Sequence, residues 1–387
     1  MNSLLAVKKR AGQREQREVY LSALKPVGFE ESTLALNGVV LKTDAYSWIQ
    51  EVLIGGYITV HWDLAVSLSD TLLIESGTSI ITSTGKGAVL RAGVNKPMFR
   101  NRNIKFSNNS TIIDKDITFN GGIWNGNGAN QNRKGTPESG ASTIFSWFGV
   151  KNLTLSNHKM YTPKTYAQQA INIENGHLLD FVVDVGLTPS INMDGVHFDG
   201  WCNNCSIKRG NIRSYDDGVG VNADDLYTSP GYGDGHMLGF YPVEAGGPSS
   251  NILIEDIVFV DSLFGVRVLS GASRVDNITI RNISGTTYNY SILIDNYFQA
   301  PNVLSRPGKG NMGTIIVDNV TTTVPTKAVT FPVNRGKIAL STSIEVLTMT
   351  NITPTGTELP MISKLTQSLG GEYTYVYGNV TLNGTAV

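Results

Sequence analysis

Short strand-like runs follow one another along most of the chain, and no helical period separates them. A phrase of the form Asn-Ile-x-Ile-x-(Asn/Asp) begins at Asn251 and again at Asn277. Such a phrase turns two β-branched residues inward and places asparagine at a corner of the backbone. An α/β fold is disfavoured because its parallel strands would need helices of about ten residues or more between them. The pattern therefore predicts an all-β fold, a right-handed parallel β-helix.

A β-sandwich is the alternative fold, but its hairpins should show Asn-Gly or Asp-Gly turns at more even spacing than this chain has. Strand-sized segments begin near residue 57 and continue towards the C-terminus. We therefore expect a β-helix domain over residues 56–387 and a short helical arm or cap over residues 1–55. Two segments rich in glycine, asparagine and proline, residues 125–141 and 296–312, are expected to rim a groove.

The charge balance of the chain limits its partners. The formal net charge is −1 at pH 7, whereas a nucleic-acid binder would carry a surplus of lysine and arginine. No run reaches the roughly 18 apolar residues of a membrane span. The first residues lack the pattern of a secretory signal, so we expect the protein on a virion tail or in the cytoplasm, or secreted if a leader has been removed. Cys202 and Cys205 lack the further ligands of a zinc site and are interpreted as two thiols or a local bridge.

Three carboxylates lie on two strand-like runs that are about one coil apart. Asp194 precedes the run Val-His-Phe, and Asp216 and Asp217 precede the run Val-Gly-Val. The 22 positions from Asp194 to Asp216 are about what one coil of a parallel β-helix uses. Stacked strands lie about 4.8 Å apart, so the carboxylates would meet and at least one pKa would rise. Glycosidases need such a set, with one carboxyl protonated and another ionised.

Four motifs then occur in a fixed order along the chain. They are Asn192-x-Asp194-Gly, the pair Asp216-Asp217, Gly235-His236 and Gly265-Val-Arg267. Together they resemble the polygalacturonase family of glycoside hydrolases, family 28, whose fold is a right-handed parallel β-helix. The resemblance implies hydrolysis with inversion, in which Asp216 is the general acid and Asp194 and Asp217 hold and deprotonate the attacking water. It implies no cofactor and no metal.

The resemblance also implies roles for residues around these carboxylates. His236 would tune their protonation, and Asn192 and Arg267 would bind the substrate. The sequence departs from the family pattern at Met237, where the family usually has glycine, and at Leu269, where it usually has the lysine that grips a uronate carboxylate. The sequence therefore keeps the hydrolytic residues of the family better than it keeps the residues that recognise pectin.

The expected partner is therefore a polysaccharide, which is a bacterial capsule, an O-antigen or a pectin-like polymer. A bacteriophage tailspike depolymerase, which would be a homotrimer, fits these features. Two alternatives stay open. One is a polysaccharide lyase of the same fold, with Arg267 as a base and acidic residues holding calcium. The other is a tail protein that binds a glycan without cleaving it.

Overall fold

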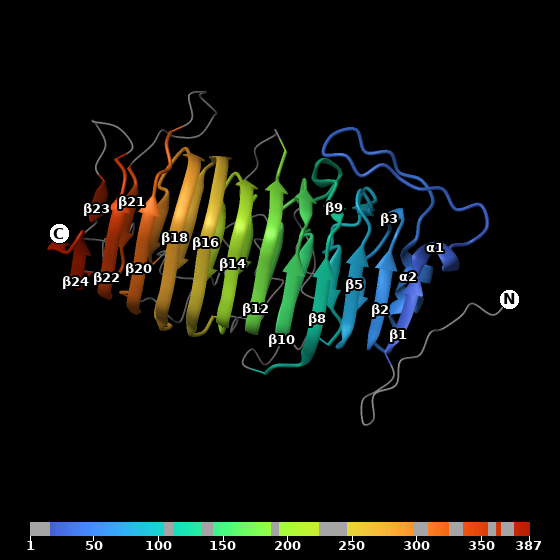
Figure 1. Cartoon of the computed structure of the whole chain (residues 1–387), viewed down its shortest axis with the longest axis horizontal. Coiled ribbons are helices and arrows are strands. Elements are labelled where there is room, and N and C mark those ends of the chain that lie inside the picture. The colour runs from blue at the N-terminus through green and yellow to red at the C-terminus, as the bar shows by residue number, and fades with distance from the viewer. Residues whose placement is uncertain are drawn as a thin grey trace.

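The chain coils into one elongated solenoid in this computed structural model, with strands stacked along its length (Figure 1). The structure describes residues 16–103, 111–132, 142–186, 193–223, 246–296, 309–324, 336–354, 361–364 and 375–387. Within these ranges neighbouring strands pair in parallel, apart from an antiparallel pair at the C-terminal end. This arrangement confirms the predicted parallel β-helix.

The strands form three ladders, each running along the solenoid axis. The first ladder consists of β1 (Arg17–Tyr20), β2 (Ile58–Trp62), β5 (Thr78–Thr82), β8 (Asp114–Asn120), β10 (Phe145–Ser156), β12 (Gln168–Asp184), β14 (Asn203–Arg213), β16 (Ser249–Ser262), β18 (Val275–Thr287), β20 (Met312–Val320), β22 (Ile344–Ile352) and β24 (Tyr377–Leu382). The second ladder consists of β4 (Leu72–Ile74), β7 (Phe99–Asn101), the first residues of β10 and β12, β13 (Val196–Phe198), β15 (Asp217–Asn222), β17 (Phe264–Leu269), β19 (Ile292–Asp295), β21 (Ile338–Ser341) and β23 (Ile362–Lys364).

The third ladder has separate strands only in the N-terminal half, and its last separate strand pairs with the final residues of β12. It consists of β3 (Ala65–Leu68), β6 (Gly87–Leu90), β9 (Ile123–Asn125) and β11 (Lys159–Tyr161). The remaining elements are α1 (Leu21–Leu24), α2 (Tyr46–Leu53), the 3₁₀ turn η1 (Gly128–Asn130) and β25 (Thr385–Ala386), which pairs with β24.

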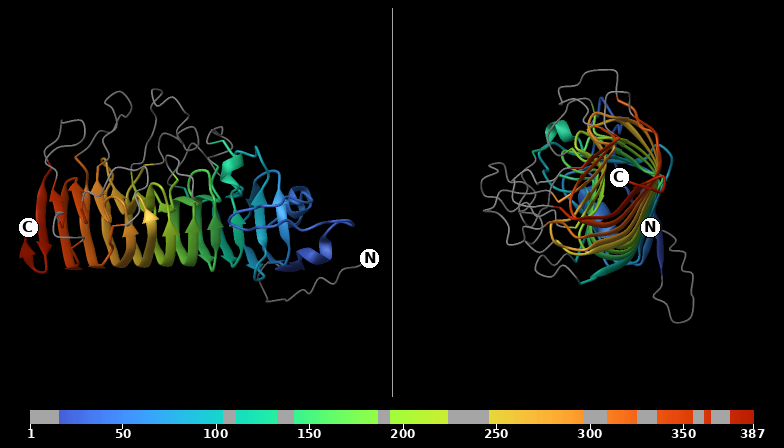
Figure 2. Two further views of the ribbon diagram at one scale, coloured as in Figure 1. Left: turned by 90° about the horizontal axis from the view of Figure 1, so that it is seen from above. Right: turned by 90° about the vertical axis from the view of Figure 1, so that its left-hand side faces the viewer.

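Alternate side chains of the second ladder point into the solenoid. Val196, Val219, Val266, Ile292 and Ile338 lie in register on successive rungs, and all are fully buried. Burying one such side chain contributes about 1.5–3 kcal/mol. The view along the axis in Figure 2 shows the rungs superposed around this interior. The residues between these aliphatic positions face away from the core, and His197 and Arg267 of the candidate site are among them.

Asparagines turn the backbone at the corners between strands. Asn152, Asn175 and Asn204 have φ values of 58°, 68° and 57°. Asparagine tolerates this left-handed conformation better than other residues with a side chain. The Asn175 amide donates to Asn152 Oδ1 at 2.9 Å, and the Asn204 amide donates to Asn175 Oδ1. The predicted corner asparagine therefore both turns the chain and links one rung to the next.

The helices of the described residues lie mostly at the N-terminal end (Figure 1). β1 pairs with β2, and the buried side chains Ile49 and Leu53 of α2 belong to the hydrophobic core. A short helical cap is thus present, while the domain boundary after residue 55 stays a prediction. Cys202 and Cys205 are free, buried thiols. None of the helices in the described ranges combines the length and the apolar character needed to cross a membrane.

Candidate active site

Two carboxylates, Asp194 and Asp217, lie one rung apart where β13 and β15 begin. The N–H of Asp217 donates to Asp194 Oδ1 at 3.2 Å, and the N–H of Gly195 donates to the carbonyl of Asp217 at 2.8 Å. Both side chains are almost wholly buried, with 2 % and 3 % of their surface exposed. The structure therefore brings together two of the three carboxylates that the sequence singled out.

Two glycines make this close approach possible. A Cβ atom on Gly195 would lie 2.0 Å from the carbonyl oxygen of Gly218 on the next rung. A Cβ atom on Gly220 would lie 2.4 Å from Cε1 of His197, its partner in register. Both distances are far inside van der Waals contact, so only glycine fits at either position. The first glycine sets the spacing of the carboxylates, and the second leaves room for an imidazole.

His197, in the middle of β13, lies between acidic groups. Its Nδ1 is 3.2 Å from Asp199 Oδ1, and the Tyr166 ring packs edge-on against it with 4.6 Å between the centroids. Burial alone would lower the pKa of His197, but the charge of Asp199, followed by those of Asp194 and Asp217, outweighs burial and raises the pKa to about 9. His197 is therefore a cation at neutral pH, and its Nδ1–H donates to Asp199.

Two buried polar atoms of this cluster have no hydrogen-bond partner within the described ranges. They are Nε2 of His197 and Oδ1 of Asp217. One ligand-type atom each from Asp194, His197 and Asp217 lies within 4.8 Å of the other two. Buried polar groups at this spacing are commonly satisfied by one water molecule that bonds to several of them. The geometry thus suits a water held between a carboxylate and an imidazolium.

Arg267 on β17 pairs with two carboxylates at once. Its Nε and Nη2 donate to Asp295 at 3.1 and 2.8 Å, and its Nη1 donates to Asp217 Oδ2 at 3.2 Å. Arg267 is 8 % exposed and occupies the rung after Gly220. Burial raises the pKa of Asp217, although Arg267 and His197 act in the opposite direction. Arg267 therefore holds Asp217 in place as well as compensating its charge.

The other residues predicted from the sequence are placed differently. Asp216 is half-buried, immediately before β15, and its carboxylate is not part of the cluster of Asp194, His197 and Asp217. The backbone carbonyl of Asp216 accepts hydrogen bonds from Ser214 Oγ at 3.1 Å and from the N–H of Phe264 at 3.3 Å. Asn192 and His236 lie outside the described residues.

Three residues of the site were not predicted from the sequence. His197 lies in β13 and Asp199 follows the end of this strand, two positions further on, a spacing that favours the same face. Asp295 ends a strand two rungs beyond Asp217 and binds the arginine between them. The spacing of two residues in the sequence could therefore have identified His197 and Asp199 as neighbours on one face. Asp295 could be recognised only after the rungs were aligned.

The cluster also has the donor types of a metal site. Asp194, His197 and Asp217 offer two carboxylates and an imidazole within 4.8 Å. A metal ligand must be deprotonated, whereas the raised pKa of His197 keeps its ring protonated at neutral pH. Asp217 is already engaged by Arg267. The arrangement is therefore better suited to hydrogen bonding than to holding a divalent cation.

We expect the free energy of unfolding to fall as the pH rises from about 6.5 to about 9. The pKa of His197 is about 9 in the folded chain against 6.5 ordinarily, so folding is favoured by proton binding. This contribution, about 3 kcal/mol, is complete below pH 6.5 and is lost as the pH passes through 9. Chemical denaturation at several pH values measures it. The His197→Gln variant should give a flatter profile, and an equally steep fall in that variant would contradict the assignment.

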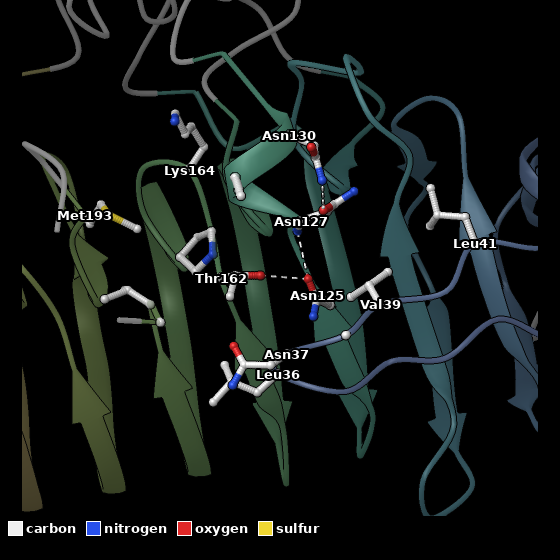
Figure 3. Close-up of a pocket in the computed structure, with 16 residues that line it drawn as sticks. Leu36, Asn37, Val39, Leu41, Asn125, Asn127, Asn130, Thr162, Lys164 and Met193 are labelled. Atoms are coloured by element: carbon white, nitrogen blue, oxygen red, sulfur yellow. Dashed lines mark hydrogen bonds between the residues drawn. The ribbon is translucent and has the colours of Figure 1, made fainter. Parts of the chain in front are cut away.

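Figure 3 shows a cavity of about 560 Å³ whose wall includes Met193. It is walled by an N-terminal segment that includes Leu36 and Val39, by Asn127 at the start of η1, and by Lys164 and Met193. Met193 immediately precedes Asp194 in the chain, so the cavity adjoins the segment that carries this carboxylate. We call it the Lys164 pocket.

Known structures with this fold resemble the chain at low sequence identity. A family 28 exopolygalacturonase of Yersinia enterocolitica matches with a TM-score of 0.52 and 12 % identity, over 96 % of this chain and 78 % of the other. A surface protein and adhesin of Streptococcus pneumoniae matches with a TM-score of 0.47 and 12 % identity, over 95 % and 97 %. The A-module of a mannuronan C-5 epimerase of Azotobacter vinelandii has a TM-score of 0.41 and 10 % identity, over 95 % and 98 %.

At such low identity the exopolygalacturonase supports the fold alone. No curated protein sequence matches the chain. The family assignment comes from the sequence model of the glycosyl hydrolases family 28, which matches residues 72–364. This range is well over half of the chain and contains the second ladder from β4 to β23. The chain therefore belongs to family 28 of the glycosyl hydrolases.

Proposed function

We propose that this protein hydrolyses a polysaccharide with inversion at the anomeric carbon. Membership of family 28 supports polysaccharide hydrolysis. The observation that carries the mechanism is the buried pair of Asp194 and Asp217, with an unsatisfied oxygen of Asp217 and an unsatisfied nitrogen of His197 at the same place. That pair suits an attacking water, which an inverting enzyme must hold opposite its general acid.

In this mechanism each carboxyl has one task. Asp216 protonates the glycosidic oxygen as its bond to the anomeric carbon breaks. Asp217, assisted by Asp194, takes a proton from water as the water oxygen bonds to that carbon. The raised pKa of the buried Asp217 makes it a stronger base than an exposed aspartate. The half-buried Asp216, outside the water-binding cluster, is positioned more suitably for the leaving group than for the water.

His197 and Arg267 act in this proposal as positioning residues. Two carboxylates one rung apart would repel each other and favour protonation of one of them. The imidazolium of His197 and the guanidinium of Arg267 offset this repulsion. They also fix the rotamer of Asp217, because Arg267 holds one of its two oxygens and leaves the other directed to the water.

The test uses a panel of bacterial capsular, O-antigen and pectic polysaccharides. Release of reducing ends identifies the substrate class, and proton NMR of the first product identifies its anomeric configuration. The proposal predicts a product anomer opposite to that of the bond cleaved. A product with retained configuration would contradict the inverting mechanism, and an unsaturated product would show a lyase.

We expect chelation of divalent cations to change the rate of hydrolysis by less than about twofold. No step of the proposed mechanism uses a metal, and Arg267 already compensates the charge of Asp217. The lyase alternative needs calcium or another neutraliser and a free base, whereas Arg267 is bonded to Asp217 and Asp295. Activity assays with and without EDTA measure this effect. Loss of activity in EDTA that calcium restores would favour the lyase.

The setting inferred from the sequence is a homotrimeric phage tailspike that acts on capsule or O-antigen. Its support is Leu269, where the family's uronate-binding lysine is absent. The homotrimer and the place on a virion stay predictions. A monomeric mass in light scattering, together with activity on plant pectin alone, would contradict them.

A further inference from the structure

The cleavage site has no cation available for an acidic sugar within the described ranges. Arg267 is nearly buried and already bonds to Asp217 and Asp295. His197 is bonded to Asp199 and is fully covered. Four buried carboxylates, those of Asp194, Asp199, Asp217 and Asp295, therefore face two cations, and a uronate carboxylate placed here would meet net negative charge.

The position of Leu269 reinforces this conclusion. Leu269 lies in register between Asn222 on the preceding rung and Asp295 on the following rung, and it is 1 % exposed. These three residues in register therefore present the amide of Asn222, the apolar side chain of Leu269 and the carboxylate of Asp295, which is already paired with arginine. Residues 224–245, which follow Ala223, contain no lysine or arginine in their sequence, whereas residues 297–308, which follow Asn296, contain Arg306. The described part of the cleavage site thus favours a neutral sugar.

A cation is available nearby, in the Lys164 pocket. Among the described side chains that line this pocket, only that of Lys164 is charged. It forms no ion pair within the described ranges and is half-buried. A half-buried lysine that lines a cavity of about 560 Å³ and forms no ion pair within the described ranges is a suitable partner for an anionic group of a ligand.

The side chains of Asn125, Asn127, Asn130 and Thr162 are engaged in holding the wall of the pocket. Asn125 Oδ1 accepts from the N–H of Asn127 at 2.8 Å and from Thr162 Oγ1 at 2.7 Å. The amide of Asn130 donates to Asn127 Oδ1 at 2.8 Å, as Figure 3 shows. These bonds make the wall rigid around Lys164. The pocket is therefore preformed, and its charged group is left for the ligand.

We propose that Lys164 binds the carboxylate of an acidic sugar in the same polysaccharide chain whose neutral sugar occupies the cleavage site. The inference rests on the proposed hydrolase function and names its substrate class, an acidic heteropolysaccharide instead of a pure polyuronate. The pocket and the carboxylates are neighbours because Met193 lines the one and Asp194 belongs to the other. One glycan strand can therefore contact both.

The test measures binding, so that it does not depend on turnover. All variants are made in the Asp216→Asn protein. The polymers are polygalacturonate and acidic capsular polysaccharides that contain both uronate and neutral sugars, and each capsular polysaccharide is also tested in its carboxyl-reduced form. Affinity electrophoresis compares Lys164→Gln with Lys164→Arg. Lys159→Gln is the matched control, because Lys159 is an exposed lysine on the neighbouring strand β11.

We expect at least one acidic heteropolymer to be retained. Lys164→Gln should weaken that retention about tenfold, and Lys164→Arg and Lys159→Gln should preserve it. Carboxyl reduction should have the same effect as Lys164→Gln, and the two should not add. Added salt should also weaken the binding.

Other results overturn the inference. The first is that no polymer is retained. The second is that Lys164→Gln weakens the binding of acidic and of carboxyl-reduced polymers equally. The third is that polygalacturonate binds tightly and that its binding does not depend on Lys164. Hydrolysis by the wild type is scored separately. A protein that binds through Lys164 but cleaves nothing would refute the hydrolase while leaving the binding site intact, and cleavage that is indifferent to Lys164 would refute the binding site alone.

Discussion

Replacing Asp216 by asparagine is expected to lower the rate of reducing-end release at least about a hundredfold while leaving the affinity for the polymer unchanged. An asparagine cannot donate the proton that the leaving oxygen needs, and loss of a general acid costs on the order of 10²–10⁴ in rate. The substitution conserves shape, and Asp216 is only half-buried, so the fold should be unaffected. Steady-state release from the best polymer of the panel, with binding measured in parallel, gives both quantities.

The matched control for this experiment is Asp256→Asn. Asp256 is exposed at a corner with φ of 58°, and asparagine occupies the equivalent corners of other rungs. This variant should keep wild-type activity. Suppose that the wild type leaves the length of the glycan unchanged and that Asp216→Asn does not alter binding. These two results would point to a tail protein that binds a glycan without cleaving it. Full activity of Asp216→Asn would assign the general acid to another residue.

Replacing Arg267 by methionine is expected to lower the free energy of unfolding by about 3–5 kcal/mol. The substitution removes the partner of two buried carboxylates, Asp217 and Asp295, and uncompensated buried charge carries a penalty of this size. The pKa of Asp217 should rise further, because the cation that lowers it is gone. Chemical denaturation at neutral pH measures the loss of stability.

Arg209→Met is the control for the arginine. Arg209 also grips one aspartate with two hydrogen bonds, to Asp180 at 2.6 and 2.8 Å, but this pair lies on the surface. Its loss should leave the unfolding midpoint unchanged within error. If Arg267→Met is as stable as the wild type and instead raises KM for an acidic polymer, then the arginine is a substrate ligand, as the sequence suggested, and the neutral cleavage site is wrong.

The fold was predictable because its signal is local and repeated. Each Asn-Ile-x-Ile phrase specifies one strand and one corner, so many weak indications agree. Asp194 and Asp217 could also be paired, since they are 23 residues apart and one rung apart. The same reasoning fails for Arg267, which contacts Asp217 from 50 residues away although it lies on the next rung. An insertion between the rungs hides that neighbour from any fixed period.

The histidine of the site was missed for a related reason. The motif resemblance pointed to His236, which lies outside the described residues, whereas His197 lies inside a run that reads as an ordinary strand. Its role depends on Gly220 one rung away, where the missing side chain leaves room for the ring. Such complementarity between rungs becomes visible only when the strands are stacked.

The asparagine corners have a consequence for how this enzyme can change its substrate. Because the amide of each corner bonds to the corner before it, coils can be gained or lost only as whole units that keep this alignment. Insertion or deletion of one coil between the Lys164 pocket and the carboxylates would therefore change the distance between them along the axis by about 4.8 Å. If one polymer strand contacts both places as proposed, a change of polymer repeat would require a discrete change in this distance and not a gradual one.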